Sequence, residues 1–555
     1  MLRLEQVRIP IDPGKRREPW KPEAALKRKA ASVLHLDPTG IETVTIVRHS
    51  IDARRKPRLF DVWTLDVELS DKRAEEKLAS KLPAGVSLRK PPAEHPMAAV
   101  SDRKCLTARP VVVGAGPAGL FCAYALAKAG FRPLLLERGA DTAERDAAVR
   151  KFWSDGSLDP ENNIPFGLGG AGTFSDGKLS TGVRDHSGDG AEILRAFVAM
   201  GAPADILYEA HPHIGTDILK GVVENFRRQI EENGGEVLLK TRLTGIAFDG
   251  KSGRLTGITT TAGDFSEQVL VLAIGHSARD TFAMLCENGL EMEQKAFAVG
   301  FRVAHPQEMI DRAQYGMPAG DQLPPAVYKL TANACGRGVY SFCMCPGGRI
   351  VNASSEPGRL CVNGMSERAR DGRYANSAIV VTVAPEDYRV DGLPLEGVAF
   401  QRTLEERAFR AGAGRIPVSS YIDFAKRVRG VSGSFPAAPD PADPAACFCG
   451  GFHYADLSGI LSEELNEAIV TAMPLFGRQI RGYDGAEALF AGIESRTSSP
   501  VRMPRGGDGQ ATGHAGVYPC GEGAGYAGGI MSAAMDGLRT ARQIMEQYAP
   551  AGEHI

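Results

Sequence analysis

The 555-residue sequence has no run of about 18 consecutive apolar residues, which a membrane-spanning helix requires. Its first twenty residues also lack the apolar core of a secretory signal. Ten cysteines, several of them inside apolar or glycine-rich stretches, do not suggest a disulfide framework in a chain of this size. We therefore expect a cytoplasmic protein with reduced thiols and no membrane partner.

Signatures of several catalytic classes are also missing. The sequence has no HExxH zinc motif, no Walker A loop and no Ser/His/Asp pattern, so neither hydrolysis nor phosphoryl transfer is supported. The pairs Cys343/Cys345 and Cys447/Cys449 are too closely spaced for zinc sites, which usually contain C-x2-C, and we expect no metal. Two residues apart on a strand, they read as buried thiols on one face. A redox role is the alternative for Cys343 and Cys345, which precede a Pro-Gly-Gly turn.

Charge is unevenly distributed along the chain. The net charge is −2, but residues 1–60 hold fourteen Lys or Arg against seven Asp or Glu, which leaves −9 on the remainder. Such an excess is typical either of a solvated face or of a surface that binds nucleic acid. Because no aromatic platform or nucleic-acid-binding motif accompanies it, we favour the solvated face and keep RNA binding as the alternative.

A chain of this length predicts two or three domains. Residues 1–95 read as a small α+β module, with a helix from Pro22 to Leu36 and a strand over 65–69 in which apolar and acidic residues alternate. Between them, we expect the basic segment SIDARRKPR to form a turn. Residues 89–97, RKPPAEHPM, are polar and punctuated by proline, which is typical of a linker.

One glycine-rich segment has the full context of a dinucleotide site. The pattern GxGxxG begins at Gly114, Gly167 and Gly523, but only the first match follows an apolar strand and precedes a helix-forming stretch. A second strand then ends at Glu137, 18 residues after Gly119. The unpaired amides of the helix N-terminus suit a diphosphate, and the Glu137 carboxylate suits both hydroxyls of the neighbouring ribose. The segment predicts a Rossmann-type βαβ unit.

The third match favours a flavin dinucleotide over a nicotinamide one. It lies in a strand–loop–helix from Val517 to Met545, after which we expect no second βαβ unit. Glu522 in this loop suits the ribityl hydroxyls, which NAD lacks. A helix beginning near Gly529 can stabilise negative charge on a reduced flavin. We therefore expect FAD as the cofactor, with NAD(P)H as at most a transient reductant.

Two further segments are expected to approach the cofactor. No helix is expected after the second glycine match, so its loop more naturally passes the cofactor than cradles another dinucleotide. Its cation, Lys178, either stabilises the reduced flavin or is simply solvated. The strand LAIGH has the form of a segment that closes an FAD site, which places Gly275 near the cofactor.

The motifs GAGPAGL, LLLERG, FGLGGAGTFSDGKL, LAIGHSARD, FCMCPGG, SRTSSPVRMPR and YPCGEGAGYAGGIMSAAMDG occur in this order along the chain. Together they resemble the uncharacterised FAD-dependent dehydrogenase family, whose members carry an FAD-dependent protein C-terminal domain, and the resemblance covers essentially the whole chain. It implies a glutathione-reductase-like fold and leaves the substrate open. It also implies cofactor contacts: the pyrophosphate with Gly114, Gly116 and Gly119, the ribose with Glu137 and Arg138, and the adenine with Leu243.

We therefore predict an α/β fold with a discontinuous Rossmann-type FAD-binding domain (105–285 and 506–555), an inserted, partly β substrate domain (286–505) and the N-terminal α+β module (1–95). The residues expected to bind the cofactor are Gly114, Gly116, Pro117, Ala118, Gly119, Glu137, Arg138, Lys178, Leu179, Leu243, Gly275, Gly521, Glu522, Gly529 and Ile530. The candidates for catalysis are Lys178, His276, Cys343, Cys345 and Arg496, with His453 and Arg502 as further candidates for proton transfer and anion binding.

Three functions account for these features. The leading hypothesis is a cytoplasmic FAD-dependent oxidoreductase that exchanges hydride with a small organic substrate at the interface of two domains. The second is an RNA-directed flavoprotein whose basic module brings nucleic acid to the flavin. The third is a flavin-binding regulatory protein without enzymatic activity. The sequence leaves the substrate and the oligomeric state open.

Overall fold

The computed structural model describes residues 1–11, 23–79, 81–89, 103–185, 187–266, 268–320, 323–431 and 444–551. The chain divides into two compact units: unit 1 comprises Met1–Val100, Pro203–Pro212 and Asp311–Ala326, and unit 2 comprises the remainder. The linker expected over 89–97 falls outside the described residues, apart from Arg89. No helix among the described residues is long and apolar enough to cross a membrane.

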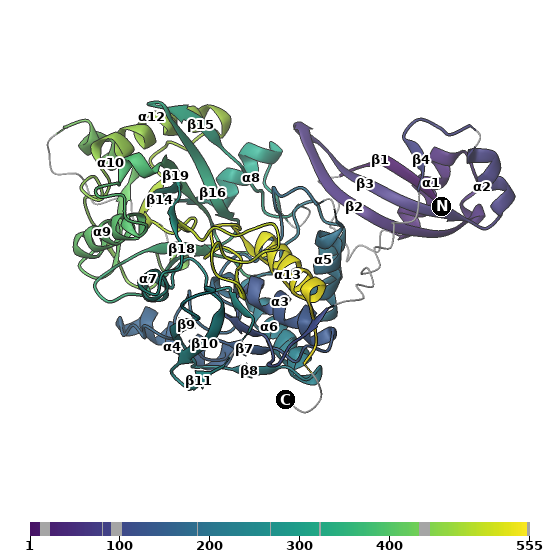
Figure 1. Ribbon diagram of the computed structural model, residues 1–555. Helices are drawn as coiled ribbons and strands as arrows, with labels where there is room; N and C mark the ends of the chain where they lie inside the picture. The colour runs from purple at the N-terminus through teal and green to yellow at the C-terminus, as the bar shows by residue number, and fades with distance from the viewer. Residues whose placement is uncertain are drawn as a thin grey trace. The chain divides into compact units, whose positions relative to one another are not determined.

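The N-terminal part of unit 1 is the expected α+β module, drawn in purple in Figure 1. Its elements are β1 (Leu2–Pro10), α1 (Glu23–Leu34), β2 (Ile41–Arg55), β3 (Arg58–Leu69), α2 (Lys72–Ala79) and β4 (Val86–Leu88). The antiparallel strand order β2-β3-β1-β4 is that of a ferredoxin-like unit. Leu65 and Val67 pack with Leu26 and Leu34 of α1, which explains the alternation seen in the sequence.

The expectation that SIDARRKPR forms a turn is wrong for most of its length. β2 continues through it to Arg55 and pairs with β3, so only Lys56 and Pro57 separate the two strands. Asp52 forms ion pairs with Arg8 (2.6 Å) and Arg54 (2.8 Å). Because the Asp52 carboxylate contacts both guanidiniums, it offsets part of their positive charge, and the basic residues do not prevent strand pairing.

A segment distant in sequence, Pro203–Pro212, belongs to unit 1 through His49. The His49 ring lies 2.8 Å from both Asp61 and Glu209, and its backbone N–H donates to the carbonyl of Tyr208 at 2.7 Å. Burial lowers the pKa of His49, but the two carboxylates outweigh burial and raise it to about 9. The imidazolium therefore holds this segment on the sheet at neutral pH.

Unit 2 contains a five-stranded parallel sheet in the order β25-β12-β6-β7-β8. Its strands are β6 (Val111–Val113), β7 (Leu134–Leu136), β8 (Glu236–Leu238), β12 (Leu270–Leu272) and β25 (Val517–Pro519). Helix α3 (Pro117–Lys128) packs beside α13 (Ile530–Gln547), shown in yellow in Figure 1. The α/β class with a Rossmann-type sheet is thus confirmed, and β25 returns to complete the sheet begun at β6.

A second, seven-stranded sheet in unit 2 has the order β15-β16-β19-β14-β23-β20-β22. Its strands are β14 (Phe297–Pro306), β15 (Thr331–Ala334), β16 (Arg337–Cys345), β19 (Tyr374–Val383), β20 (Ile416–Ser420), β22 (Phe452–Tyr454) and β23 (Leu489–Glu494). The nearby helices include α9 (Glu396–Ala411), α10 (Tyr421–Val428) and α12 (Glu463–Gln479). This sheet lies within the stretch expected to form the inserted domain.

The remaining α-helices and β-strands of the described chain are as follows. The helices are α4 (Thr142–Asp155), α5 (Asp189–Ala199), α6 (Thr216–Glu232), α7 (Arg279–Glu287), α8 (Gln307–Tyr315) and α11 (Pro444–Cys447). The strands are β5 (Lys104–Cys105), β9 (Leu243–Phe248), β10 (Leu255–Thr260), β11 (Gly263–Phe265), β13 (Glu293–Gln294), β17 (Arg349–Asn352), β18 (Val362–Met365), β21 (Phe448–Cys449), β24 (Val501–Arg502) and β26 (Tyr548–Ala549).

Candidate functional site

The expected dinucleotide loop joins β6 to α3 at the carboxyl edge of the parallel sheet. A Cβ at Gly114, whose φ is +99°, would lie 2.3 Å from the carbonyl oxygen of Ala273, and one at Gly119 would lie 1.8 Å from that of Gly114. Both positions therefore require glycine. Helix α3 begins after Gly116, and among the described residues no side chain caps it. Its first amides are left for a ligand, which is the arrangement that binds diphosphates.

A cavity of about 360 Å³ opens over this loop, within the range of about 300–1,000 Å³ typical of ligand sites. Since β6 lies between β7 and β12 in the sheet, the cavity extends to two sides of the loop. The β7 side is lined by Glu137, Arg138, Thr241 and Leu243, and the β12 side by Gly275, His276, Glu494, Glu522 and neighbouring residues. A long ligand centred on the loop would reach both sides.

Glu137 is more heavily engaged than the sequence suggests. Its Oε1 accepts hydrogen bonds from the amides of Gly139 and Gly167, both at 2.9 Å, and its Oε2 accepts one from Ala115 at 2.8 Å. A carboxylate offers about four acceptor positions, so one remains for a ribose hydroxyl rather than the expected two. The buried carboxylate chiefly ties three loops together beneath the cavity.

Arg138 and Leu243 both lie on the β7 side, as expected. The Arg138 guanidinium donates to Glu161 (2.9 Å) and Asp280 (2.8 Å), and it lies over the Phe166 ring at 4.0 Å. These contacts fix its plane. It offers a rigid polar wall to the ligand rather than a free charge.

The second glycine-rich segment lies directly on the first. The Gly169 amide donates to the carbonyl of Ala115 at 2.8 Å, and the loop then lines the cavity as far as Lys178. The Lys178 Nζ is buried and, within the described part of the chain, has no hydrogen-bond partner; its nearest counter-charge is Asp176, 3.7 Å away. An ammonium in this state is suited to an anionic or electron-rich ligand.

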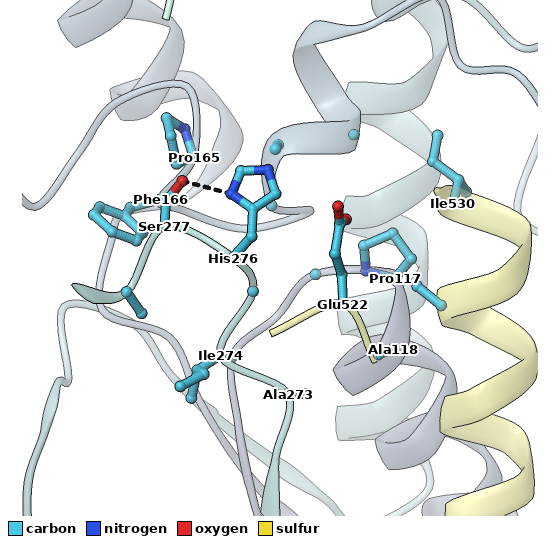
Figure 2. Close-up of a pocket in the computed structure, with 18 of the residues that line it drawn as sticks. Pro117, Ala118, Pro165, Phe166, Ala273, Ile274, His276, Ser277, Glu522 and Ile530 are labelled. Carbon is cyan, nitrogen blue, oxygen red and sulfur yellow. Dashed lines mark hydrogen bonds between the residues drawn. The ribbon is translucent and has the colours of Figure 1, made fainter. Parts of the chain in front are cut away.

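Glu522 points into the β12 side beside Pro117 and Ala118, and Ile530 stands at the start of α13 across from them (Figure 2). Burial raises the pKa of Glu522 to about 8, although Lys295 opposes the shift. Helix α13 begins after Gly529, and no described side chain caps it. A second helix N-terminus thus faces the cavity.

His276 lines the cavity, where its Nδ1 lies 2.7 Å from the hydroxyl of Ser277 (Figure 2). Burial, reinforced by the charges of Arg496 and Arg279, lowers the pKa of His276 to about 3. Efficient proton transfer requires a pKa near the working pH, so His276 is poorly matched to that role. His453 is exposed on β22 and does not line the cavity.

Arg496 lines the cavity, but its guanidinium donates its hydrogen bonds to other side chains of the protein. It donates to Glu405 at 2.8 and 2.9 Å, to Ser355 at 2.6 Å and to Ser277 at 3.1 Å. The sequence leaves two roles open for Arg496, binding of an anionic substrate or a structural bridge, and these contacts favour the bridge. Arg502 is exposed on β24 and does not line the cavity.

Most of the predicted residues meet at this one cavity. Those that do not line it are Gly119, Leu179, Gly521, Cys345, His453 and Arg502. Gly119 and Gly521 act instead through packing, since a Cβ at Gly521 would lie 2.7 Å from that of Ala118. Leu179 and Cys345 are buried behind the lining.

Sequence reasoning missed the pair formed by Arg302 and Glu494. The Nε of Arg302 donates to Glu494 at 2.9 Å, the guanidinium is fully buried, and Glu494 lines the cavity. Burial raises the pKa of Glu494 to about 7 against the pull of Arg302. Each of two apolar strands, FAVGFRVAHP and LFAGIE, carries one charged residue, Arg302 and Glu494 respectively. Because charged residues are rarely buried unless they are paired, this pattern could have predicted the ion pair.

The site fits FAD. Two glycine-only positions, two uncapped helix N-termini and a buried ammonium are arranged around one elongated cavity. Among the described residues, no group of three or more His, Cys, Asp or Glu side chains is placed to hold a metal ion.

Comparison with protein families agrees with this fit. Residues 296–497 match a model described as "FAD-dependent protein, C-terminal domain-like", and residues 112–145 match an NAD(P)-binding Rossmann-like domain. Residues 1–68 match a domain of unknown function. The cofactor of the protein is FAD.

One curated relative covers nearly the whole chain. It is an uncharacterized protein from Clostridium beijerinckii, 42% identical over 530 residues, which span 94% of this chain and 96% of the relative.

Solved structures with similarity to the chain include glycine oxidase from Bacillus cereus (11% identity, 80% of this chain and 96% of that one, TM-score 0.29). L-proline dehydrogenase from P. horikoshii is another (11% identity, 81% and 95%, TM-score 0.32). At such scores we draw no conclusion from either.

Proposed function

Because the chain belongs to the family of FAD-dependent proteins that carry this C-terminal domain, we propose that it is an oxidoreductase that exchanges hydride between FAD and a small organic substrate. The observation that carries the proposal is the charge around the β12 side of the cavity. Glu522 and Glu494 line it with pKa values raised by burial to about 8 and about 7, and the buried Nζ of Lys178 lines the same cavity. Groups that titrate near neutrality suit the proton transfers that accompany hydride exchange.

FAD, when bound, supplies a two-electron hydride acceptor or donor. The residues of the chain have separate tasks. The amides at the start of α3 bind the diphosphate, and Glu137 accepts from the ribose. Lys178 and the N-terminus of α13 stabilise negative charge on the β12 side, while Glu522 and Glu494 hold and release protons.

In residues 1–11, 23–79 and 81–89 of the basic module, no observation favours a nucleic-acid function. Arg8 and Arg54 are paired with Asp52, and Arg3 and Arg89 are paired with Asp66. These contacts engage four guanidiniums, but they leave the net positive excess of residues 1–60 unchanged, because Asp52 is already counted in it and Asp66 lies outside it. That hypothesis stays a prediction, which a steep loss of RNA affinity with salt would support.

The test of the proposed function is anaerobic mixing of the holoprotein with NADH, NADPH and a panel of organic donors, followed by acceptors. We expect at least one donor to bleach the flavin and at least one acceptor to reoxidise it faster than oxygen does. If no pair turns over, the third hypothesis, a flavin-binding regulatory protein, replaces an oxidoreductase.

Replacement of Glu522 by glutamine is expected to change the pH dependence of flavin reduction. Because the pKa of Glu522 is raised to about 8, the wild-type group is neutral below that pH and a carboxylate above it. Two like charges about 10 Å apart repel by about 1.7 kcal/mol at an effective dielectric of about 20, roughly tenfold in rate. Wild type should therefore slow by about tenfold between pH 7 and pH 9 relative to E522Q.

The measurement is the stopped-flow bleaching rate across pH 6–10, with the exposed Glu287→Gln as the control. Identical pH profiles for wild type and E522Q would show that Glu522 does not carry this charge.

A further inference from the structure

Cys343 and Cys345 are not an ordinary pair on one face of a strand, contrary to the sequence interpretation. In the pairing of β16 with β19, Phe342 is opposite Ala378 and Cys345 is opposite Asn376. One extra residue therefore sits on β16, which is a β-bulge. Cys343 within it has a φ of +46°, in the left-handed region that a cysteine rarely adopts. A bulge breaks the regular alternation of side chains along the strand, so the two cysteines do not share the same surroundings as residues i and i+2 normally do.

The bulge gives the two thiols different surroundings. Cys343 lines the cavity that holds Lys178 and Glu522, whereas Cys345 is fully buried behind it. The Cys345 thiol lies 3.4 Å from the carbonyl oxygen of Cys343. The Arg302 guanidinium donates to that same carbonyl at 3.1 Å and lies 3.9 Å from the Cys345 sulfur.

These contacts favour a thiolate next to a thiol. A hydrogen bond from Cys345, together with the charges of Arg302 and Lys178, lowers the pKa of Cys343 to about 5 although burial opposes the shift. The same hydrogen bond and burial raise the pKa of Cys345. The nucleophilic sulfur thus faces the cavity and its resolving partner lies directly behind.

We propose that Cys343 and Cys345 form a redox-active dithiol that exchanges two electrons with the FAD bound in the same cavity. The inference rests on the proposed function and names its substrate class. In the oxidising direction an S–S bond forms between the two residues, the S–H bond of Cys345 breaks, and one proton and two electrons pass to the oxidised isoalloxazine. In the reverse direction the disulfide takes up two electrons and one proton, the S–S bond breaks, and the Cys343 thiolate and Cys345 thiol are restored. A dithiol passes electrons onward by thiol–disulfide exchange, so the substrate class is a small disulfide.

The experiment is an anaerobic reductive titration of the holoprotein with dithionite. Wild type should take up twice as many electrons per flavin as C343S and C345S, because the disulfide accepts two electrons in addition to those of FAD. Alkylation under denaturing quench provides a readout independent of the flavin. Cys343 and Cys345 should be protected from alkylation in the oxidised protein and modified in the reduced one, as mapped by mass spectrometry.

Cys335→Ser is the matched control. Cys335 lies in the turn before the same strand, also has a positive φ (+52°), and does not line the cavity. It should titrate as wild type does. The dithiol proposal would be overturned if the wild-type flavin bleaches normally, the wild type takes up no more electrons than C343S, and both thiols are alkylated in the oxidised state. That result would not contradict the proposed oxidoreductase function. Failure of every donor to bleach the flavin would instead overturn the proposed function.

Discussion

Replacement of Gly119 by alanine is expected to yield protein without bound flavin. The added Cβ would lie 1.8 Å from the carbonyl oxygen of Gly114, which is backbone and cannot rotate away. Helix α3 must then move off β6, and its first amides leave the diphosphate position. We expect FAD affinity to fall by more than about 100-fold, which corresponds to about 2.7 kcal/mol. The measurement is the ratio of flavin absorbance to protein absorbance after purification, followed by titration with added FAD.

Gly221→Ala is the matched control. Gly221 lies in α6, where an added Cβ meets nothing within 4 Å. This variant should bind FAD as tightly as wild type, and it also serves as a check on helix stability, since alanine favours helices. Full flavin content in G119A would mean that the close approach of α3 to the loop is not what holds the cofactor.

Glu405→Gln is expected to cause the largest loss of stability. The carboxylate is fully buried, and its oxygens accept hydrogen bonds from Arg279 and Arg496 at 2.8–2.9 Å and from Ser495 at 2.7 Å. Although burial opposes it, the two guanidiniums hold the pKa of Glu405 well below its usual range. Removing the charge leaves buried cations undercompensated, which typically costs about 3–5 kcal/mol.

The measurement is the free energy of unfolding in urea at pH 7. The stabilisation by Glu405 is present above the unfolded-state pKa and is lost as pH falls, so the difference between wild type and E405Q should shrink only in acid. The neighbouring Glu406, half-exposed and paired with Arg359 at 2.9 Å, provides the control. E406Q should lose no more than about 1 kcal/mol. Equal losses in the two variants would contradict the role given to the buried cluster.

The local parts of the site could be predicted from the sequence. Gly114, Gly116 and Glu137 lie within one βαβ unit, where strand, turn and helix signals follow one another within about thirty residues. The buried triplets Val111–Val113 and Leu134–Leu136 show this plainly. Glu522 was also found, because it follows the end of a short apolar strand and precedes a clear helix.

The parts built from distant segments could not be predicted. Arg302 and Glu494 are 192 residues apart, and only the pairing of β14 with β23 brings them together. His49 meets Glu209 across 160 residues for a similar reason. Three backbone amides donate hydrogen bonds to the Glu137 carboxylate. Their loops have to be placed in space before these bonds can be recognised.

Composition alone does not show which charges are paired in the folded chain. The basic residues of SIDARRKPR suggested a turn, yet the segment continues β2 as far as Arg55, and Asp52 pairs with Arg54 and with Arg8 of β1. The bulge at Cys343 was likewise invisible, because no residue type in FCMC marks a change of register. Net charge and residue spacing carry no information about the residues that a segment meets in the folded protein.

The central claim is that the cavity over the loop at Gly114–Gly119 holds one FAD through its diphosphate. The most direct test is calorimetric titration of flavin-stripped protein with FAD, FMN and NADPH. The account predicts one FAD per chain, bound at least about 100-fold more tightly than FMN, which lacks the adenosine diphosphate half. Equal affinity for FMN, or no uptake of FAD, would contradict it.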